Sequence, residues 1–342
     1  MCTGIRLKSK NGAIVYARTL EFGKETDSNI IVIPRNYEYS GTNKQGESKG
    51  LQWRSKYAVI GANMLHINDI VDGVNEKGLA GGLFYFPGFA EYQKVSHHEE
   101  AHSIAPWELM TWILTNFESV DDVRAVLPTI KVADIVFDLW NIVPPIHAII
   151  HDKKGNSLVI EYRKGELTMH DNQWGVITNA PSFDWHRINL SNYINLTPIN
   201  VEPIRYNNMI LSPLGEGSGM LGLPGDFTPP SRFVRAVAFS QAAMDLSTED
   251  EARKTAFHIL NLFTITRGLV REEQGENSYY DYTQWTSASD LKNSRYYWHT
   301  YENRQIKMVD LMQMNLNAEK IVTVPMHTEE IILDVSKEKN IF

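Results

Sequence analysis

The chain of 342 residues has a single cysteine, which excludes an intramolecular disulfide framework and any cysteine-rich metal site. It also lacks long apolar runs. Stretches such as Ile30 to Ile33 are far too short to cross a bilayer, and no basic region followed by an apolar segment opens the sequence. These absences favour a cytoplasmic protein without a membrane anchor.

Basic residues are fewer than acidic ones: the sequence has 33 Lys and Arg and 41 Asp and Glu, which gives a formal net charge of −8. A polyanion would meet repulsion over most of the surface, so nucleic acid and anionic membranes are not expected as partners. The sequence shows no internal repeat, low-complexity tract or flexible linker. With a hydrophobic content of 43%, it predicts one globular domain over residues 1–342.

The one cysteine, Cys2, directly follows the initiator Met1. Its small side chain permits removal of Met1, after which one residue carries a thiol and an α-amine with a pKa of about 7.7–8.0. Covalent catalysis needs a nucleophile with a proton acceptor in reach, and such an amine supplies one. By position alone, an incidental small residue is the more common explanation.

The pattern of strands and helices predicts an α+β protein. Residues 2–7 and 13–18 flank a turn at Asn11-Gly12, the strongest short signal for a hairpin. Further strands are predicted at 30–33, 57–60, 81–86, 146–151, 157–162 and 175–178, and helices at 106–117, 121–127, 233–244 and 249–263. Strands and helices fall in separate groups, which favours packed layers over repeated βαβ units.

Two short motifs suggest metal or cofactor chemistry. His98 and His102 match a zinc-protease pattern, but polar neighbours and Pro106 favour a solvated loop. Residues 217–222 match a dinucleotide fingerprint, yet Leu223-Pro224 follows where a helix should begin. We therefore predict no metal and no cofactor.

Three polar residues suit an amide hydrolase that uses Cys2. Arg18 and Glu21 lie where the hairpin returns beside Cys2; Arg18 would stabilise the thiolate and Glu21 would hold the α-amine. Asn179 ends the predicted strand 175–178, where its amide can face a cleft. Surface charges and a plain turn asparagine are the alternatives. The apolar segment 135–145 is either a core strand or the wall of a substrate pocket.

Long, collinear motifs resemble the choloylglycine hydrolase family, the N-terminal-nucleophile hydrolases that include bile salt hydrolases and penicillin V acylases. The resemblance covers essentially the whole chain. Its motifs include Met1-Cys2-Thr3-Gly4, Asn75-Glu76-Lys77-Gly78-Leu79, Thr178-Asn179-Ala180-Pro181, Gly222-Leu223-Pro224-Gly225-Asp226 and Ser231-Arg232-Phe233.

The resemblance implies a four-layer αββα sandwich and a homotetramer, with an assembly extension between Asn179 and Arg232. It makes Cys2 the nucleophile with its α-amine as base, and it places Arg18 and Arg232 beside the thiol. The Asn179 amide and the Tyr85 backbone N–H become the oxyanion donors. Glu21 stands where the family usually has Asp.

Tyr85 stands where many bile salt hydrolases have Asn. At this position the chain is more similar to the penicillin V acylases.

The resemblance also implies a small-molecule amide substrate with an apolar acyl part. Glycine- or taurine-conjugated bile salts are the favoured substrate class. Their sterol body is expected to bind Leu20, Val136, Phe137 and Trp140. Penicillin V and acyl-homoserine lactones are alternative substrates. Alternatives of other classes are a zinc hydrolase and a catalytically silent binding protein that keeps the same fold.

Overall fold

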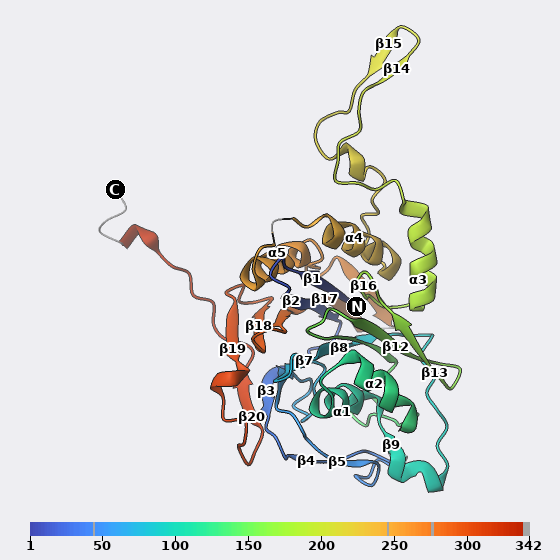
Figure 1. Ribbon diagram of the computed structural model, residues 1–342, viewed down its shortest axis with the longest axis vertical. Coiled ribbons are helices and arrows are strands. Elements are labelled where there is room, and N and C mark those ends of the chain that lie inside the picture. The colour runs from blue at the N-terminus through green and yellow to red at the C-terminus, as the bar shows by residue number, and fades with distance from the viewer. Residues whose placement is uncertain (44, 245, 275–276, 338–342) are drawn as a thin grey trace.

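Two antiparallel β-sheets form the centre of the computed structural model, which describes residues 1–43, 45–244, 246–274 and 277–337 (Figure 1). The first sheet has the order β1 (Cys2–Lys8), β2 (Ile14–Phe22), β17 (Asn277–Asp290), β18 (Arg295–Thr300) and β19 (Lys307–Asp310), with β16 (Val270–Gln274) paired to β17. The second has the order β13 (Glu166–Asp171), β12 (Ser157–Arg163), β11 (Ile146–His151), β8 (Ala80–Tyr85), β7 (Asp72–Asn75), β6 (Val59–Ala62), β3 (Asn29–Ile33) and β20 (Val322–Pro325).

Helices cover the outer face of each sheet, as Figure 1 shows. Helix α4 (Pro229–Ala242) contacts β1, and α5 (Glu249–Asn261) contacts β1, β2 and β17. Helix α1 (Leu109–Asn116) packs on β7 and β8 of the other sheet, and α2 (Val120–Val126) follows it. A shared apolar core that includes Val15, Phe84 and Trp285 joins the sheets. The predicted α+β fold with four αββα layers is confirmed.

The remaining elements are short. Helix α3 (Phe183–Asn189) follows the second sheet, and small strand pairs are β4 (Glu38–Ser40) with β5 (Gln52–Arg54), and β9 (Ser103–Ile104) with β10 (Lys131–Val132). Single-turn or short 3₁₀ helices are His97–His102, Pro106–Glu108, Leu127–Thr129, Leu190–Tyr193, Ser218–Met220, Leu311–Gln313 and Val335–Lys337. Within the described ranges, no helix has the length and apolarity needed to cross a membrane.

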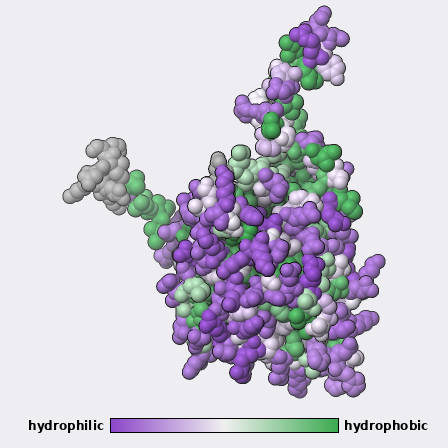
Figure 2. All heavy atoms as spheres, viewed as in Figure 1, coloured by the Kyte–Doolittle hydropathy of each residue, from purple (hydrophilic) through white to green (hydrophobic). Residues whose placement is uncertain are grey.

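A hairpin arm, residues 194–224, projects from the body of the molecule (Figure 1). Its strands are β14 (Ile204–Tyr206) and β15 (Met209–Leu211). Figure 2 shows apolar side chains on this arm, and large ones are strongly exposed, among them Ile194, Ile199, Met209, Leu214 and Leu221.

The opening hairpin is confirmed, with Cys2 opposite Leu20 and Gly4 opposite Arg18. The predicted strand at 175–178 is wrong. Gly4 and Ile177 exchange two backbone hydrogen bonds of 2.8 and 3.0 Å, but this pairing is an isolated bridge because the chain turns away at Asn179. The strand predicted at 57–60 begins at Val59 instead.

Candidate active site

Cys2 begins β1 and is only 4% exposed. Its Sγ accepts a hydrogen bond of 2.8 Å from Nη2 of Arg18, whose side chain is completely buried. Burial alone lowers the pKa of Arg18, but the charges of Cys2, Tyr16 and Asp72 outweigh this effect and raise it. A fixed guanidinium at this distance favours the thiolate, the reactive form of a cysteine.

Asn179 and Arg232 meet the backbone of Cys2. The Cys2 N–H donates to Oδ1 of Asn179 at 2.9 Å, and Nη2 of Arg232 donates to the same oxygen at 2.7 Å. Two donors on Oδ1 fix the orientation of the amide. Its Nδ2 donates to the Tyr85 carbonyl at 2.6 Å. Nη1 of Arg232 also donates to the Cys2 carbonyl and, at 2.9 Å, to Oγ1 of Thr3.

The Tyr85 backbone N–H faces the same edge as these groups. Leu83 N–H donates to the Val71 carbonyl at 2.8 Å, and Phe86 N–H donates to the Pro145 carbonyl at 2.7 Å on the opposite side. Since backbone groups alternate sides along a strand, the Tyr85 N–H points the same way as that of Leu83. The Tyr85 N–H lies past the end of the neighbouring strand β7, which begins at Asp72. It is on the same side of β8 as the Tyr85 carbonyl, which accepts the hydrogen bond from Asn179.

Glu21 is fully buried, and burial raises its pKa even though the N-terminal ammonium and Arg232 oppose this shift. Its Oε1 accepts from Oγ1 of Thr283 at 2.9 Å. The Met1 ammonium donates to the Glu21 backbone carbonyl at 2.5 Å, and the Cys2 nitrogen donates to Asn179. With Met1 in place, the Glu21 carboxylate therefore makes no hydrogen bond to the Cys2 nitrogen, and its contact with a freed α-amine stays a prediction. The carboxylate is directed to Thr283 instead.

A small apolar cavity of about 70 Å³ opens at Cys2. Of the residues predicted to bind substrate, Leu20, Phe137 and Trp140 line it. Val136 is 46% exposed and is not one of the lining residues. The segment 135–145 is therefore a pocket wall and not a core strand. Sequence reasoning missed the rest of the apolar lining, which includes Met64, Leu65, Ile67 and Trp107.

A second, more polar cavity of about 540 Å³ lies beside the first. Its lining includes Met1, Lys24, Asn179 and Asp281. Phe22, Tyr85 and Trp140 line both cavities; the rings of Phe22 and Trp140 stack 5.3 Å apart. The site therefore offers an apolar side and a polar side about Cys2, which suits the two halves of an amide with an apolar acyl part.

The two short motifs form no site of this kind. His98 and His102 lie exposed on the 3₁₀ helix His97–His102, where a loop was predicted. Gly217 precedes a single turn, Ser218–Met220, and no α-helix begins there.

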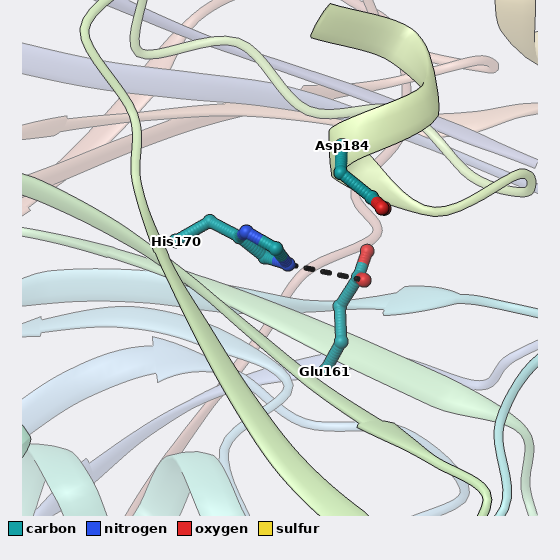
Figure 3. Close-up of side chains that lie close together, drawn as sticks. All are labelled: Glu161, His170 and Asp184. Carbon is teal, nitrogen blue, oxygen red and sulfur yellow. Dashed lines mark ion pairs between the residues drawn. The ribbon is translucent and has the colours of Figure 1, made fainter.

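One cluster has the composition of a metal site. Glu161, His170 and Asp184 offer ligand atoms within 4.8 Å of one another (Figure 3). Arg163 already supplies a positive charge there: its Nη1 lies 3.1 Å from Oδ1 of Asp184 and its Nε lies 3.4 Å from Oε2 of Glu161. We therefore interpret the cluster as a charge network around the buried Glu161 carboxylate.

Replacement of Glu161 with glutamine should reduce stability in a pH-dependent way. Burial raises the pKa of Glu161, but contacts with His147 and His170 outweigh it and lower the pKa from 4.5 to about 2. A lowered pKa stabilises the fold above pH 4.5, and the contribution is lost as the pH falls through 2. The free energy of unfolding should drop by about 3 kcal/mol near neutral pH.

Chemical denaturation at about pH 7 and about pH 3 measures this difference, which should shrink at the lower pH. Glu166→Gln, at an exposed position on β13, is the matched control and should leave stability unchanged. A deficit that is equal at both pH values would contradict the assignment.

Comparison with known proteins agrees with this architecture. Two packed antiparallel sheets between helical layers define the fold of the N-terminal-nucleophile hydrolases. Residues 2–324 match the model of the linear amide C–N hydrolases, choloylglycine hydrolase family, and the chain belongs to this family. The predicted family and the predicted enzyme class, an amidohydrolase of linear amides, are both confirmed.

Individual relatives support the same assignment. The chain is 36% identical to a bile salt hydrolase/transferase of Clostridium perfringens over 94% of this chain and 96% of that protein. The crystal structure of the C2A mutant of conjugated bile acid hydrolase from the same organism superposes with a TM-score of 0.87 at 34% identity, covering 98% and 100% of the two chains. A penicillin V acylase of Pectobacterium atrosepticum is 25% identical over 88% of this chain and 78% of that protein.

Proposed function

We propose that this protein hydrolyses glycine- or taurine-conjugated bile salts through a thioester on Cys2. The observation that carries the proposal is the buried Cys2 thiol, 2.8 Å from Arg18, in a chain 36% identical to a bile salt hydrolase/transferase. The apolar cavity at the thiol supports an apolar acyl group, and the larger polar cavity beside it has room for the amine part of the substrate.

In the proposed acylation, Met1 has been removed and the Cys2 nitrogen is a free amine. Sγ attacks the substrate carbonyl, and the thiol proton passes to the α-amine and then to the leaving amine as the C–N bond breaks. Arg18 stabilises the thiolate. The second N–H of the Asn179 amide and the Tyr85 backbone N–H hold the oxyanion. In the second half, the α-amine takes a proton from water, which attacks the thioester and releases the acid and the thiol.

Arg232 and Glu21 support this arrangement. Arg232 holds Oδ1 of Asn179, which leaves Nδ2 directed at the site. Glu21 lies near the N-terminal ammonium and Arg232, whose positive charges partly oppose the rise in its pKa that burial causes. We assign both as positioning residues.

Asn179→Ala should lower kcat by about 10² to 10³, the usual cost of losing one oxyanion donor. Steady-state kinetics on the same substrate measures the effect, with Asn192→Ala as a control because Asn192 is exposed beyond the site. A kcat for Asn179→Ala equal to that of the control would remove Asn179 from the mechanism.

The substrate class is tested by a hydrolysis panel of glycocholate, taurocholate, penicillin V and a long-chain acyl-homoserine lactone, read by mass spectrometry. Release of glycine or taurine as the fastest reaction supports the proposal. If penicillin V is hydrolysed fastest, the enzyme is instead a penicillin V acylase. Its aromatic acyl group would then contact Trp107, Phe137 and Trp140, which line the apolar cavity.

We propose a homotetramer in the cytoplasm. The exposed apolar side chains of the hairpin arm, such as Ile194 and Leu214, support assembly because exposed groups of this kind usually mark interfaces. The single free cysteine suits a reducing compartment. Light scattering should give four chain masses, and a single chain mass would contradict the assembly.

A further inference from the structure

Two buried histidines lie directly behind the segment that carries Asn179. Nε2 of His147, on β11, lies 3.1 Å from the Thr178 carbonyl oxygen, and Nε2 of His186, on α3, lies 3.0 Å from the Asn179 carbonyl oxygen. A carbonyl oxygen only accepts hydrogen bonds, so each Nε2 carries the hydrogen and donates it. The two carbonyl groups that flank the Asn179 α-carbon are therefore both held by imidazole N–H groups.

Each histidine ring also stacks on the chain neighbour of another site residue. The His147 ring lies 4.2 Å from the Phe86 ring with an angle of 2°, and Phe86 follows Tyr85. The His186 ring lies 4.6 Å from the Phe233 ring with an angle of 15°, and Phe233 follows Arg232. The histidines thus connect the Asn179 segment to the segments that carry Tyr85 and Arg232.

Glu161 anchors this arrangement from β12. Its Oε1 accepts the Phe183 N–H at 2.8 Å and lies 3.4 Å from Nδ1 of His147. With a pKa of about 2, the carboxylate is ionised and only accepts. His147 therefore faces an acceptor at each ring nitrogen, the Thr178 carbonyl at Nε2 and the Glu161 carboxylate at Nδ1. Burial lowers the pKa of His186 to about 4, so that ring is neutral near pH 7.

We propose that His147 and His186 are positioning residues that hold Asn179 in place as an oxyanion donor. Residues 178–182 belong to no helix or strand, so their carbonyl groups need other partners. A misplacement of about 1 Å in a catalytic group can cost about 10² in rate. The inference rests on the proposed function, which makes the Asn179 amide the donor to the oxyanion.

The test uses His147→Phe and His186→Phe, which keep an aromatic ring against Phe86 and Phe233 but remove the N–H donor. His170→Phe is the matched control. His170 approaches the same carboxylate, with Nε2 3.7 Å from Oε2 of Glu161 (Figure 3), and has no hydrogen bond to either carbonyl. The substrate is the member of the panel that the wild type hydrolyses fastest.

We expect kcat to fall about 10-fold to 100-fold in His147→Phe and in His186→Phe, with KM unchanged. The rate at which iodoacetamide alkylates Cys2 should remain that of the wild type, because alkylation needs the thiolate but no oxyanion donor. His170→Phe should keep the wild-type kcat. This separation of turnover from thiol reactivity is not expected of a general loss of structure.

Two results would overturn the inference: a wild-type kcat in a folded His147→Phe or His186→Phe, or a parallel loss of turnover and alkylation. His147→Gln and His186→Gln carry an amide donor and should recover part of kcat, and they decide the question where a Phe variant does not fold. Failure of the proposed function is distinguished by Cys2→Ala. If that variant still turns over substrate, the mechanism itself is wrong, whatever the histidine variants do.

Discussion

Replacement of Cys2 with alanine should abolish amide hydrolysis, with a loss on the order of 10⁴ or more, as for other enzymes that lose their covalent nucleophile. The side chain is buried in a well-packed site and loses only its sulfur, so the fold should persist. The other contacts of Arg18 should also persist in this variant. Its Nη1 donates to the Leu83 carbonyl at 2.7 Å, and its guanidinium lies 4.1 Å from the Phe84 ring centre. Hydrolysis is followed by mass spectrometry and folding by thermal denaturation.

The single thiol of the chain makes this experiment unusually direct. One added carbamidomethyl group after iodoacetamide treatment can only be on Cys2, and its appearance should parallel the loss of activity in the wild type. Cys2→Ser is the matched variant, because it keeps a hydroxyl in place of the thiol and should retain a small residual rate. Turnover in Cys2→Ala at the wild-type rate would exclude the thioester route and would leave a metal-dependent hydrolase to be tested with chelators.

The parts of the fold that could be predicted are those with strong local signals. Asn11-Gly12 between two β-rich runs specifies the opening hairpin without any tertiary information. The long strand β17 carries no such signal, since buried polar residues such as Gln284, Ser287 and Ser289 interrupt any apolar alternation. These side chains are accommodated by partners across the fold, for example Asp72 for Ser287, which a local pattern cannot reveal.

The site divides in the same way. Arg18 follows from the hairpin register, which returns the second strand beside Cys2. Tyr85 and Arg232 were predicted only through the family resemblance, since nothing in their local sequence marks them. The histidines behind Asn179 carried no sequence signal at all, because His147 lies in an ordinary apolar strand and His186 in a short helix. Sequence spacing says little about which distant carbonyl group a buried histidine will meet.

An extension of a few residues ahead of Cys2 should slow hydrolysis strongly but leave the thiol reactive. The Cys2 nitrogen would then be a peptide nitrogen, which has no basic lone pair, so the proton acceptor proposed for both half-reactions is lost. We expect a decrease of about 10² to 10⁴ in kcat, the range for removal of a general base. Alkylation of Cys2 should continue, because the guanidinium of Arg18 still lies 2.8 Å from Sγ.

The structure shows the state that such an extension would resemble. With Met1 in place, the N-terminal ammonium donates to the Glu21 carbonyl at 2.5 Å, and Met1 lines the larger cavity in which the amine part of the substrate is proposed to lie. The control is a protease site placed so that cleavage leaves Cys2 as the first residue. Cleavage should restore hydrolysis fully. If the uncleaved form is as active as the cleaved one, the base is not the α-amine, and Glu21, buried nearby with a raised pKa, becomes the group to replace next.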